Sequence, residues 1–244
     1  MTTREHYEEF LAGHYTWMFG MPFDAKVAEQ RRFLEESGAL PAKRRLALDL
    51  GAGSGFQTMA LADLGFDRVI AVDFSPRLLA ELDSRKGTRA IETVEADLND
   101  YLARFPHGAA DAILCMGDTL THLAGKEDVQ RLLKAAASAL SEGGVLVLTY
   151  RDLSAELAGT DRFIPVASDA DRILTCFLEY APDFVAVHDL LYERAGTAWQ
   201  LRASTYRKLR LPIAWLEDAL KDAGLAPVER RPAGRLSGLI AWKR

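Results

Sequence analysis

Three closely spaced glycines, Gly51, Gly53 and Gly55, identify the part of the sequence that could bind a ligand. They follow the apolar segment Leu46–Leu50, which is expected to form a strand, and they lead into a helix. Glycines in such a turn allow backbone N–H groups to approach a ligand at the edge of a parallel sheet. A second apolar segment, Val69–Asp73, ends in an acid about twenty residues later, where such folds hold a ribose through its hydroxyl groups. Together these residues predict a site for a nucleoside cofactor.

The spacing of the glycines narrows the choice of cofactor. A dinucleotide-binding turn has its third glycine one place later, where this sequence has Phe56. An NAD-dependent dehydrogenase is therefore disfavoured. The spacing, with Asp49 just before the turn, resembles the first motif of class I S-adenosylmethionine-dependent methyltransferases. That resemblance implies S-adenosyl-L-methionine as the cofactor and S-adenosyl-L-homocysteine as its product. A structural turn followed by a chance acid stays open as an alternative.

A second candidate segment follows the expected strand Asp111–Met116 and reads Gly117-Asp118-Thr119-Leu120-Thr121-His122-Leu123. In an open α/β sheet the carboxyl end of such a strand faces the ligand crevice. The segment resembles the Gly-Asn-Ser-x-x-His-Leu element of glycine and sarcosine N-methyltransferases, except that Asp118 stands where that family has asparagine. A carboxylate here could attract an ammonium group or accept a proton from a hydroxyl or thiol. Asp118 could equally cap the turn that follows it.

The resemblance also implies which residues contact the cofactor. The glycine turn, with Ala52, would lie under the methionine part, and Asp73 would hold the ribose. The N-terminal aromatic segment His14–Phe19 would cover the methionine end. The implied cofactor site comprises Tyr15, Trp17, Gly51, Ala52, Gly53, Gly55, Asp73, Phe74, Asp97 and Leu98 (framing the adenine), and Met116 and Gly117 (near the sulfonium).

The acceptor is expected to be oriented by Asp118, His122 and Arg151. Arg151 follows the next expected strand. In glycine-type enzymes an arginine at this position clamps the carboxylate of the amino acid, and the planar guanidinium fork suits that target. An ion pair with Asp152 or another nearby acid is an equally open interpretation. Tyrosines and cations of a later segment could reach the site or face solvent, so they are left unassigned: Tyr192, Tyr206, Arg207 and Lys208.

The elements that must position these residues alternate between strand and helix from Leu46 onward, which predicts a parallel sheet covered on both faces. The expected fold is α/β: a Rossmann-like, seven-stranded, mostly parallel sheet with helices on both faces. Expected core strands are Leu46–Leu50, Val69–Asp73, Ala90–Glu95, Asp111–Met116, Val145–Tyr150, Pro227–Arg231 and Leu236–Trp242, with Gly143-Gly144 ending the connection before the fifth. Short turns separate three later β-rich segments, which predicts an antiparallel meander. These segments are Ile173–Tyr180, Phe184–Glu193 and Ala198–Leu209.

We therefore expect three parts: an N-terminal helical lid (residues 1–40), a core (residues 41–151 and 210–244) and an antiparallel β insertion on the substrate side (residues 152–209).

The 244 residues carry a net charge of −5 without a run of Lys or Arg, which argues against a nucleic acid as partner. No apolar run reaches membrane-spanning length, and residues 1–10 lack the apolar core of a signal peptide. The two cysteines, Cys115 and Cys176, are expected to be buried free thiols, with no metal site.

The function predicted from these observations is methyl transfer from S-adenosyl-L-methionine to a small molecule, with the amine of an amino acid or related metabolite as the leading acceptor. Such an in-line displacement can be accelerated by alignment and exclusion of water alone, so a dedicated base is optional. An O- or S-methyltransferase and a non-catalytic S-adenosylmethionine-binding protein are the alternatives. The protein is expected to be cytoplasmic, and a monomer or a homodimer.

Overall fold

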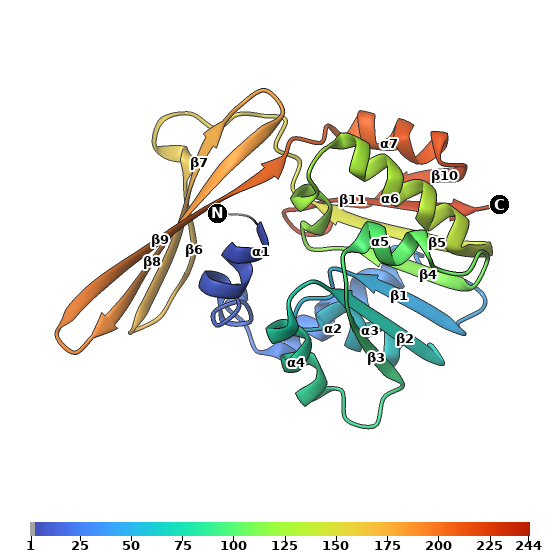
Figure 1. Cartoon of the computed structure of the whole chain (residues 1–244), viewed down its shortest axis with the longest axis horizontal. Helices are drawn as coiled ribbons and strands as arrows, with labels where there is room; N and C mark the ends of the chain where they lie inside the picture. Colours follow the sequence, from blue (N-terminus) through green and yellow to red (C-terminus); the bar gives the residue numbers. More distant parts are fainter. Residues whose placement is uncertain (1–2) are drawn as a thin grey trace.

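The computed structural model describes residues 3–244, which form two sheets with helices around one of them (Figure 1). Sheet A has seven strands in the order β10-β11-β5-β4-β1-β2-β3, and sheet B has four in the order β6-β7-β8-β9. In sheet A only β11 runs antiparallel to its neighbours. The predicted Rossmann-like, mostly parallel sheet is confirmed. Its strands are β1 (Leu46–Leu50), β2 (Arg68–Asp73), β3 (Ile91–Glu95), β4 (Ala110–Cys115), β5 (Leu140–Tyr150), β10 (Leu225–Arg230) and β11 (Ser237–Lys243).

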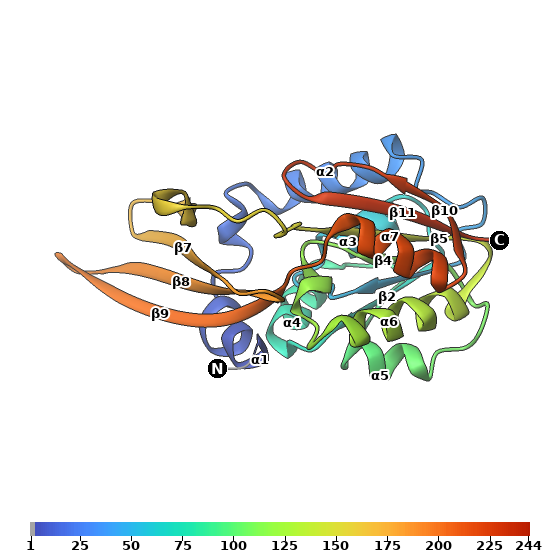
Figure 2. The ribbon, with the colours of Figure 1, turned by 90° about the horizontal axis from the view of Figure 1, so that it is seen from above.

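Helices cover both faces of sheet A (Figure 2). One face packs against α2 (Phe23–Glu36) and α3 (Phe56–Asp63), with Leu82 of α4 (Pro76–Arg85) in the same apolar cluster. The other face packs against α5 (Leu98–Ala103), α6 (Lys126–Ala139) and α7 (Ile213–Asp222). Because both faces are covered, the central strand β4 is buried along its whole length, which explains its continuous apolar sequence.

The strand order places the candidate residues at one edge of sheet A. β1 pairs with β2 on one side and with β4 on the other, so the chain direction around the sheet reverses between β1 and β4. Ligands of open α/β sheets bind outside the carboxyl ends of the strands at this point. The glycine turn after β1 and Gly117 after β4 both lie there.

Sheet B is antiparallel and extends away from sheet A (Figure 1). Its strands are β6 (Phe163–Ser168), β7 (Arg172–Tyr180), β8 (Phe184–Ala195) and β9 (Ala198–Leu209). The last three match the predicted meander, whereas β6 was not predicted. β6 is a short edge strand that contains Pro165, and proline is tolerated at an edge because no ladder hydrogen bond is lost there.

One expected boundary is wrong. Gly143-Gly144 was expected to end the connection before Val145–Tyr150, but β5 already begins at Leu140 and includes both glycines. The register between β4 and β5 shifts between Ala110 and Ala112. β5 therefore includes the two glycines at an irregular part of its pairing with β4.

The N-terminal segment lies between the two sheets (Figures 1 and 2). It comprises α1 (Thr3–Glu5), a π-helical turn η1 (His6–Leu11) and a 3₁₀ turn η2 (Trp17–Phe19). Arg4 Nη2 donates to Phe74 O at 3.0 Å after β2, while His6 Nδ1 lies 2.7 Å from Ser204 Oγ of β9. The segment therefore contacts both sheets. No helix within residues 3–244 is long and apolar enough to cross a membrane.

Candidate active site

A cavity of about 460 Å³ opens at the carboxyl edge of β1, β2 and β4, and we call it the glycine-loop cavity. Eight of the predicted cofactor residues line it: Tyr15, Gly51, Gly53, Asp73, Phe74, Asp97, Leu98 and Gly117. Its volume is within the range of ligand pockets, roughly 300–1,000 Å³. The sequence segments chosen for cofactor binding therefore meet around one space.

The glycine loop is held by backbone bonds in a conformation that favours glycine. Gly51, Gly53 and Gly55 have φ angles of +74°, +54° and +98°. Gly51 N and Ala52 N both donate to Val72 O of β2, at 2.8 and 3.1 Å. A Cβ on Gly51 would lie 2.3 Å from Thr119 Cγ2, so this position also has no room for a side chain.

Asp73 connects the end of β2 to the glycine loop. Its Oδ2 accepts from Gly53 N and its Oδ1 from Ser75 N, both at 2.8 Å. Burial raises the pKa of Asp73, whereas the hydrogen bonds from Ser75 and Gly53 lower it. A carboxylate has about four lone-pair positions. The Phe74 N–H also bonds to this carboxylate, so one position remains for a hydroxyl donor of a ribose in the cavity that Asp73 lines.

Asp97 and Leu98 line the far end of the glycine-loop cavity, where α5 begins. Asp97 Oδ1 caps this helix by accepting from Asn99 N at 2.9 Å and Asp100 N at 3.1 Å. Leu98 is buried and offers an apolar surface. An apolar side chain beside a carboxylate suits a flat base with an exocyclic amine.

Four predicted cofactor residues lie off this lining: Trp17, Ala52, Gly55 and Met116. Gly55 is the N-cap of α3 and packs against Leu82, where a Cβ would lie 2.3 Å from Leu82 Cδ1. Trp17 instead packs beneath the guanidinium of Arg172, which lies 4.4 Å from its ring. Of the two N-terminal aromatics predicted to cover the cofactor, the structure brings Tyr15 to the cavity and gives Trp17 a different partner.

A second cavity, of about 340 Å³, lies between the N-terminal segment, the edge of sheet A and the inner face of sheet B, and we call it the sheet B cavity. Tyr7, Tyr15 and Gly117 line both cavities. A ligand in the glycine-loop cavity and a ligand in the sheet B cavity would therefore meet beside these three residues. Of these two cavities, Asp118 and Arg151 line only the sheet B cavity, and His122 lines only the glycine-loop cavity.

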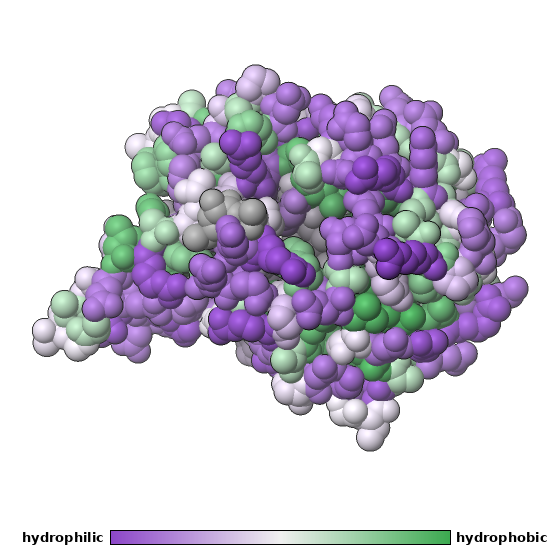
Figure 3. Space-filling model, in the orientation of Figure 1, coloured by the Kyte–Doolittle hydropathy of each residue, from purple (hydrophilic) through white to green (hydrophobic). Residues whose placement is uncertain are grey.

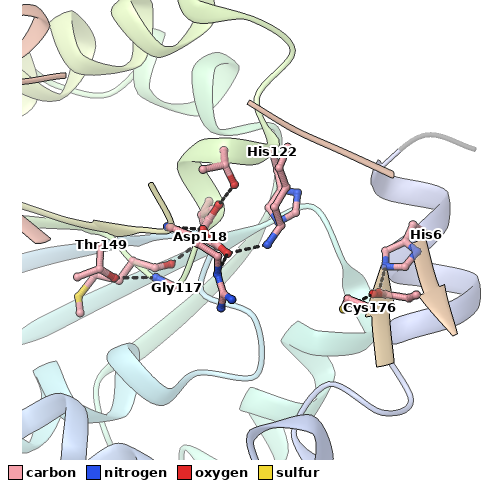
Figure 4. Close-up of polar contacts among 12 residues, drawn as sticks. His6, Gly117, Asp118, His122, Thr149 and Cys176 are labelled. Atoms are coloured by element: carbon pink, nitrogen blue, oxygen red, sulfur yellow. Dashed lines mark hydrogen bonds and ion pairs between the residues drawn. The ribbon is translucent and has the colours of Figure 1, made fainter. Parts of the chain in front are cut away.

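Asp118 is the centre of a polar network at the ends of β4 and β5 (Figure 4). It has a left-handed backbone, with φ of +85°, and it is buried. Its Oδ1 accepts from Arg151 N and its Oδ2 from Lys208 Nζ, both at 2.6 Å. Burial raises the pKa of Asp118, but Lys208 and Arg151 together lower it by more, and the outcome is a pKa of about 2. Asp118 is thus a charged, fully engaged carboxylate.

His122 lies beside Tyr7 and Tyr206. Its Nε2 is 3.2 Å from Tyr7 Oη, and its ring centroid is 5.5 Å from that of Tyr206. Burial, assisted by the Lys208 cation, lowers the pKa of His122 to about 3, so the imidazole is neutral at pH 7. Its Nδ1 is buried without a hydrogen-bond partner in the described part of the chain.

Arg151 takes part in an ion pair, which was one of its two interpretations. Its Nε lies 3.6 Å from Asp118 Oδ2, and its side chain is about half exposed, at 46%. Thus the acid that faces it is Asp118 rather than Asp152. This geometry supports the ion pair more than the other interpretation, in which Arg151 binds the carboxylate of the acceptor.

Several site residues were missed or left unassigned. Along β9, Tyr206 and Lys208 face the sheet B cavity, while Arg207 lies on the opposite face with its guanidinium over Phe184. The alternation of side chains along a strand separates these residues, but the sequence does not show which face is inward. Tyr7 had no sequence signal.

Asp189 was also missed, and it forms a polar cluster on the sheet B side with His6 and Cys176, which Figure 4 labels. His6 Nε2 lies 3.2 Å from Asp189 Oδ2, and Cys176 Sγ donates to Asp189 Oδ1 at 2.7 Å. His6 also stacks on Tyr206, with ring centroids 4.1 Å apart. Cys176 is only partly buried, because it lines the cavity rather than packing in the core of sheet A. The cluster fixes the N-terminal segment against sheet B.

The strand order, the glycine turn and the acid that ends β2 support the similarity of the chain to class I S-adenosylmethionine-dependent methyltransferases. Residues 47–144 match the family described as "Methyltransferase domain". The chain is 35% identical over 163 residues to a glycine/sarcosine N-methyltransferase of Parasynechococcus marenigrum, covering 64% of this chain and 55% of the relative. A second such protein, of Halorhodospira halochloris, is 35% identical over 153 residues, covering 61% and 56%. The chain thus spans about half the length of these curated relatives.

Solved structures share the fold over nearly the whole chain. An S-adenosylmethionine-dependent methyltransferase from Clostridium acetobutylicum superposes with a TM-score of 0.74 at 18% identity, covering 88% of this chain and 91% of that one. The sugar N-methyltransferase KedS8 from Streptoalloteichus superposes with a TM-score of 0.71 at 20% identity, covering 94% and 91%. These similarities include sheet B as well as the core.

Proposed function

We propose that the protein transfers a methyl group from S-adenosyl-L-methionine to the amine of a small molecule, an amino acid or a related metabolite. The observation that carries the proposal is that two cavities adjoin at Tyr7, Tyr15 and Gly117. One has the lining expected for a nucleoside cofactor, and the other is a separate space for an acceptor. The glycine/sarcosine N-methyltransferases to which the chain is similar support the choice of an amine.

When bound, S-adenosyl-L-methionine supplies an electrophilic methyl group on a sulfonium. In our proposal Asp73 accepts a hydrogen bond from a ribose hydroxyl, and Asp97 and Leu98 frame the adenine. The glycine loop approaches the methionine part through its backbone, since Gly51 and Gly53 carry no side chain there. Tyr15 covers Gly53 closely, because a Cβ on Gly53 would lie 3.0 Å from Tyr15 Oη.

The charges around the acceptor favour an amine over a hydroxyl or thiol. A hydroxyl or thiol must lose a proton as it attacks, and a general base works best when its pKa is near the ambient pH. Asp118 has a pKa of about 2 and His122 of about 3, so neither is suited to that task at neutral pH. An amine can lose its proton before it enters. The neutral His122 also adds no positive charge beside a sulfonium.

We further propose that the N-terminal segment, residues 3–19, acts as a lid over both cavities, whereas α2 packs against sheet A. Thr16 Oγ1 donates to Glu81 Oε1 of α4 at 2.5 Å, and Arg4 reaches Phe74 O. Tyr7 and Tyr15 close the joint between the cavities. Exclusion of water from this joint would strengthen the alignment of methyl group and amine, which is the main source of acceleration expected for such a displacement.

The test is a mass-spectrometric screen of purified protein with S-adenosyl-L-methionine and pools of amino acids, biogenic amines, phenols and thiols. Methyl addition confined to amines is the expected result. Transfer to phenols or thiols would overturn the choice of acceptor and favour the O- or S-methyltransferase alternative. Binding of S-adenosyl-L-homocysteine by calorimetry without transfer to any pool would favour the non-catalytic binder instead.

A further inference from the structure

The wall of the sheet B cavity is apolar. Side chains from the inner faces of β6, β7 and β8, together with the segment after β5, line it: Leu153, Ile164, Val166, Leu174, Leu178 and Val187. Leu153, Leu174, Leu178 and Val187 are buried, so this apolar wall is an internal surface. Hydrophilic side chains predominate on the outer face of the molecule shown in Figure 3. Glycine has no side chain that could contact this wall. An acceptor with an apolar body would cover it.

The charged residues of the same cavity are paired, with one exception. Lys26 pairs with Glu29 at 2.6 Å, and Lys208 and Arg151 both pair with Asp118. Asp189 is engaged by His6. Arg235 also lines the cavity, but it has no ion pair or hydrogen bond within residues 3–244.

Arg235 is an exposed residue at the carboxyl edge of sheet A. It belongs to the loop between β10 and β11, and Ser237, which begins β11, pairs with Tyr150 at the end of β5. The loop that carries Arg235 therefore lies at the same edge of sheet A as Gly117. A guanidinium without a partner beside an apolar wall is suited to a planar carboxylate, which it can bind through two parallel hydrogen bonds.

We infer that the acceptor is an amino acid with a large apolar side chain, which lies on the inner face of sheet B while its carboxylate pairs with Arg235. This inference rests on the proposed function, since it assumes that an amine is methylated. It assigns the carboxylate to Arg235 because Arg151 already faces Asp118. The amine is then directed toward Gly117 and Tyr15.

The experiment compares leucine, glycine and leucinamide as acceptors of the full chain. Leucinamide keeps the apolar body and the amine but lacks the carboxylate. We expect kcat/KM for leucine to exceed that for glycine at least about tenfold, since one methylene in an apolar pocket contributes roughly 10- to 200-fold. Arg235→Gln should raise the KM for leucine about 10- to 100-fold, the size of a lost charged hydrogen bond, and the KM for leucinamide less than about twofold.

Two further variants separate these effects from damage to the fold. Arg231→Gln is the matched control, because Arg231 lies in the same loop region but pairs with Glu229 and does not line the cavity. Arg231→Gln should leave the KM for leucine and the KM for leucinamide unchanged. Val166→Phe should fill part of the cavity and raise the KM for leucine more than the KM for glycine. Calorimetric affinity for S-adenosyl-L-homocysteine should be the same in all variants and in the unmodified protein.

The outcomes distinguish this inference from the proposed function. Glycine accepted as well as leucine, or an equal effect of Arg235→Gln on leucine and leucinamide, would overturn the inference and leave amine methylation in place. Methyl transfer to amines other than amino acids would also overturn the inference and leave amine methylation in place. Intact binding of S-adenosyl-L-homocysteine with no transfer to any amine would overturn both.

Discussion

The two cavities are built from different kinds of groups. In the glycine-loop cavity, the turn at Gly51–Gly53 is held by backbone groups: the N–H groups of Gly51 and Ala52 are bonded to Val72 O, and Gly53 N is bonded to Asp73. The sheet B cavity is shaped by side chains that come from the N-terminal segment, both sheets and the last loop. A backbone site is specified by short contiguous motifs, whereas a side-chain site depends on how distant segments pack.

The largest expected effect tests the backbone site. Gly51→Ala places a Cβ 2.3 Å from Thr119 Cγ2, at a φ of +74°. We expect a loss of about 2–5 kcal/mol in the free energy of unfolding, the sum of a left-handed alanine, about 1–2 kcal/mol, and local overpacking, about 1–3 kcal/mol. Urea unfolding measures it.

Gly65→Ala is the matched control for the backbone term. Gly65 has a φ of +85°, but a Cβ at this position would face open space, with no contact within 4 Å. Only the conformational cost of about 1–2 kcal/mol should therefore appear. Equal losses for the two variants would show that the close approach of Gly51 to Thr119 is unimportant.

The second prediction tests the side-chain site. Lys208→Met leaves the buried Asp118 with Arg151 as its remaining cation. Breaking a buried ion pair costs about 3–5 kcal/mol, and the retained Arg151 should keep the loss near the lower end, about 3 kcal/mol, at pH 7. Lys221→Met is the control, because Lys221 and Asp218 form an exposed pair whose loss should cost less than about 1 kcal/mol.

The pH dependence of this loss follows from the pKa of Asp118. In the unmodified protein that pKa is about 2, below the ordinary 3.8, so its contribution to stability is complete above about pH 4 and declines as the pH falls toward 2. Removal of Lys208 should raise the pKa and reduce this decline. The difference between variant and unmodified protein should therefore be smaller at pH 3 than at pH 7. A difference that is independent of pH would contradict the role assigned to Lys208.

The third prediction concerns ligand affinity. Asp73→Ala should weaken the binding of S-adenosyl-L-homocysteine by about 1–3 kcal/mol, because a ribose hydroxyl loses a charged acceptor. Isothermal titration calorimetry measures the affinity. Asp83→Ala is the control, since Asp83 bonds to Thr93 on an exposed part of the molecule and does not line the cavity. An unchanged affinity in Asp73→Ala would remove the ribose assignment.

The contrast between a site formed by local motifs and a site formed by distant side chains explains what could be predicted from the sequence. Gly51, Gly53 and Asp73 were found because a turn, a strand end and their spacing are local features. Tyr7 and Lys208 could not be assigned, because their place in the site depends on the packing of the N-terminal segment and on which face of β9 points inward. β6 was missed because Pro165 obscured a short strand, and the start of β5 was misplaced because two glycines normally interrupt a strand.

The smallest expected effect separates two neighbouring aromatic residues that the resemblance treated alike. Tyr15 lines both cavities, so Tyr15→Leu should weaken S-adenosyl-L-homocysteine about 2- to 10-fold, the scale of a lost aromatic contact. Trp17→Leu should change the affinity less than about twofold and instead reduce stability by about 0.5–1 kcal/mol, because its ring supports Arg172. Calorimetry and urea unfolding on both variants measure the two effects. A larger loss of affinity in Trp17→Leu than in Tyr15→Leu would mean that the N-terminal segment rearranges when the ligand binds, and that the backbone-built cavity also depends on side chains brought from a distance.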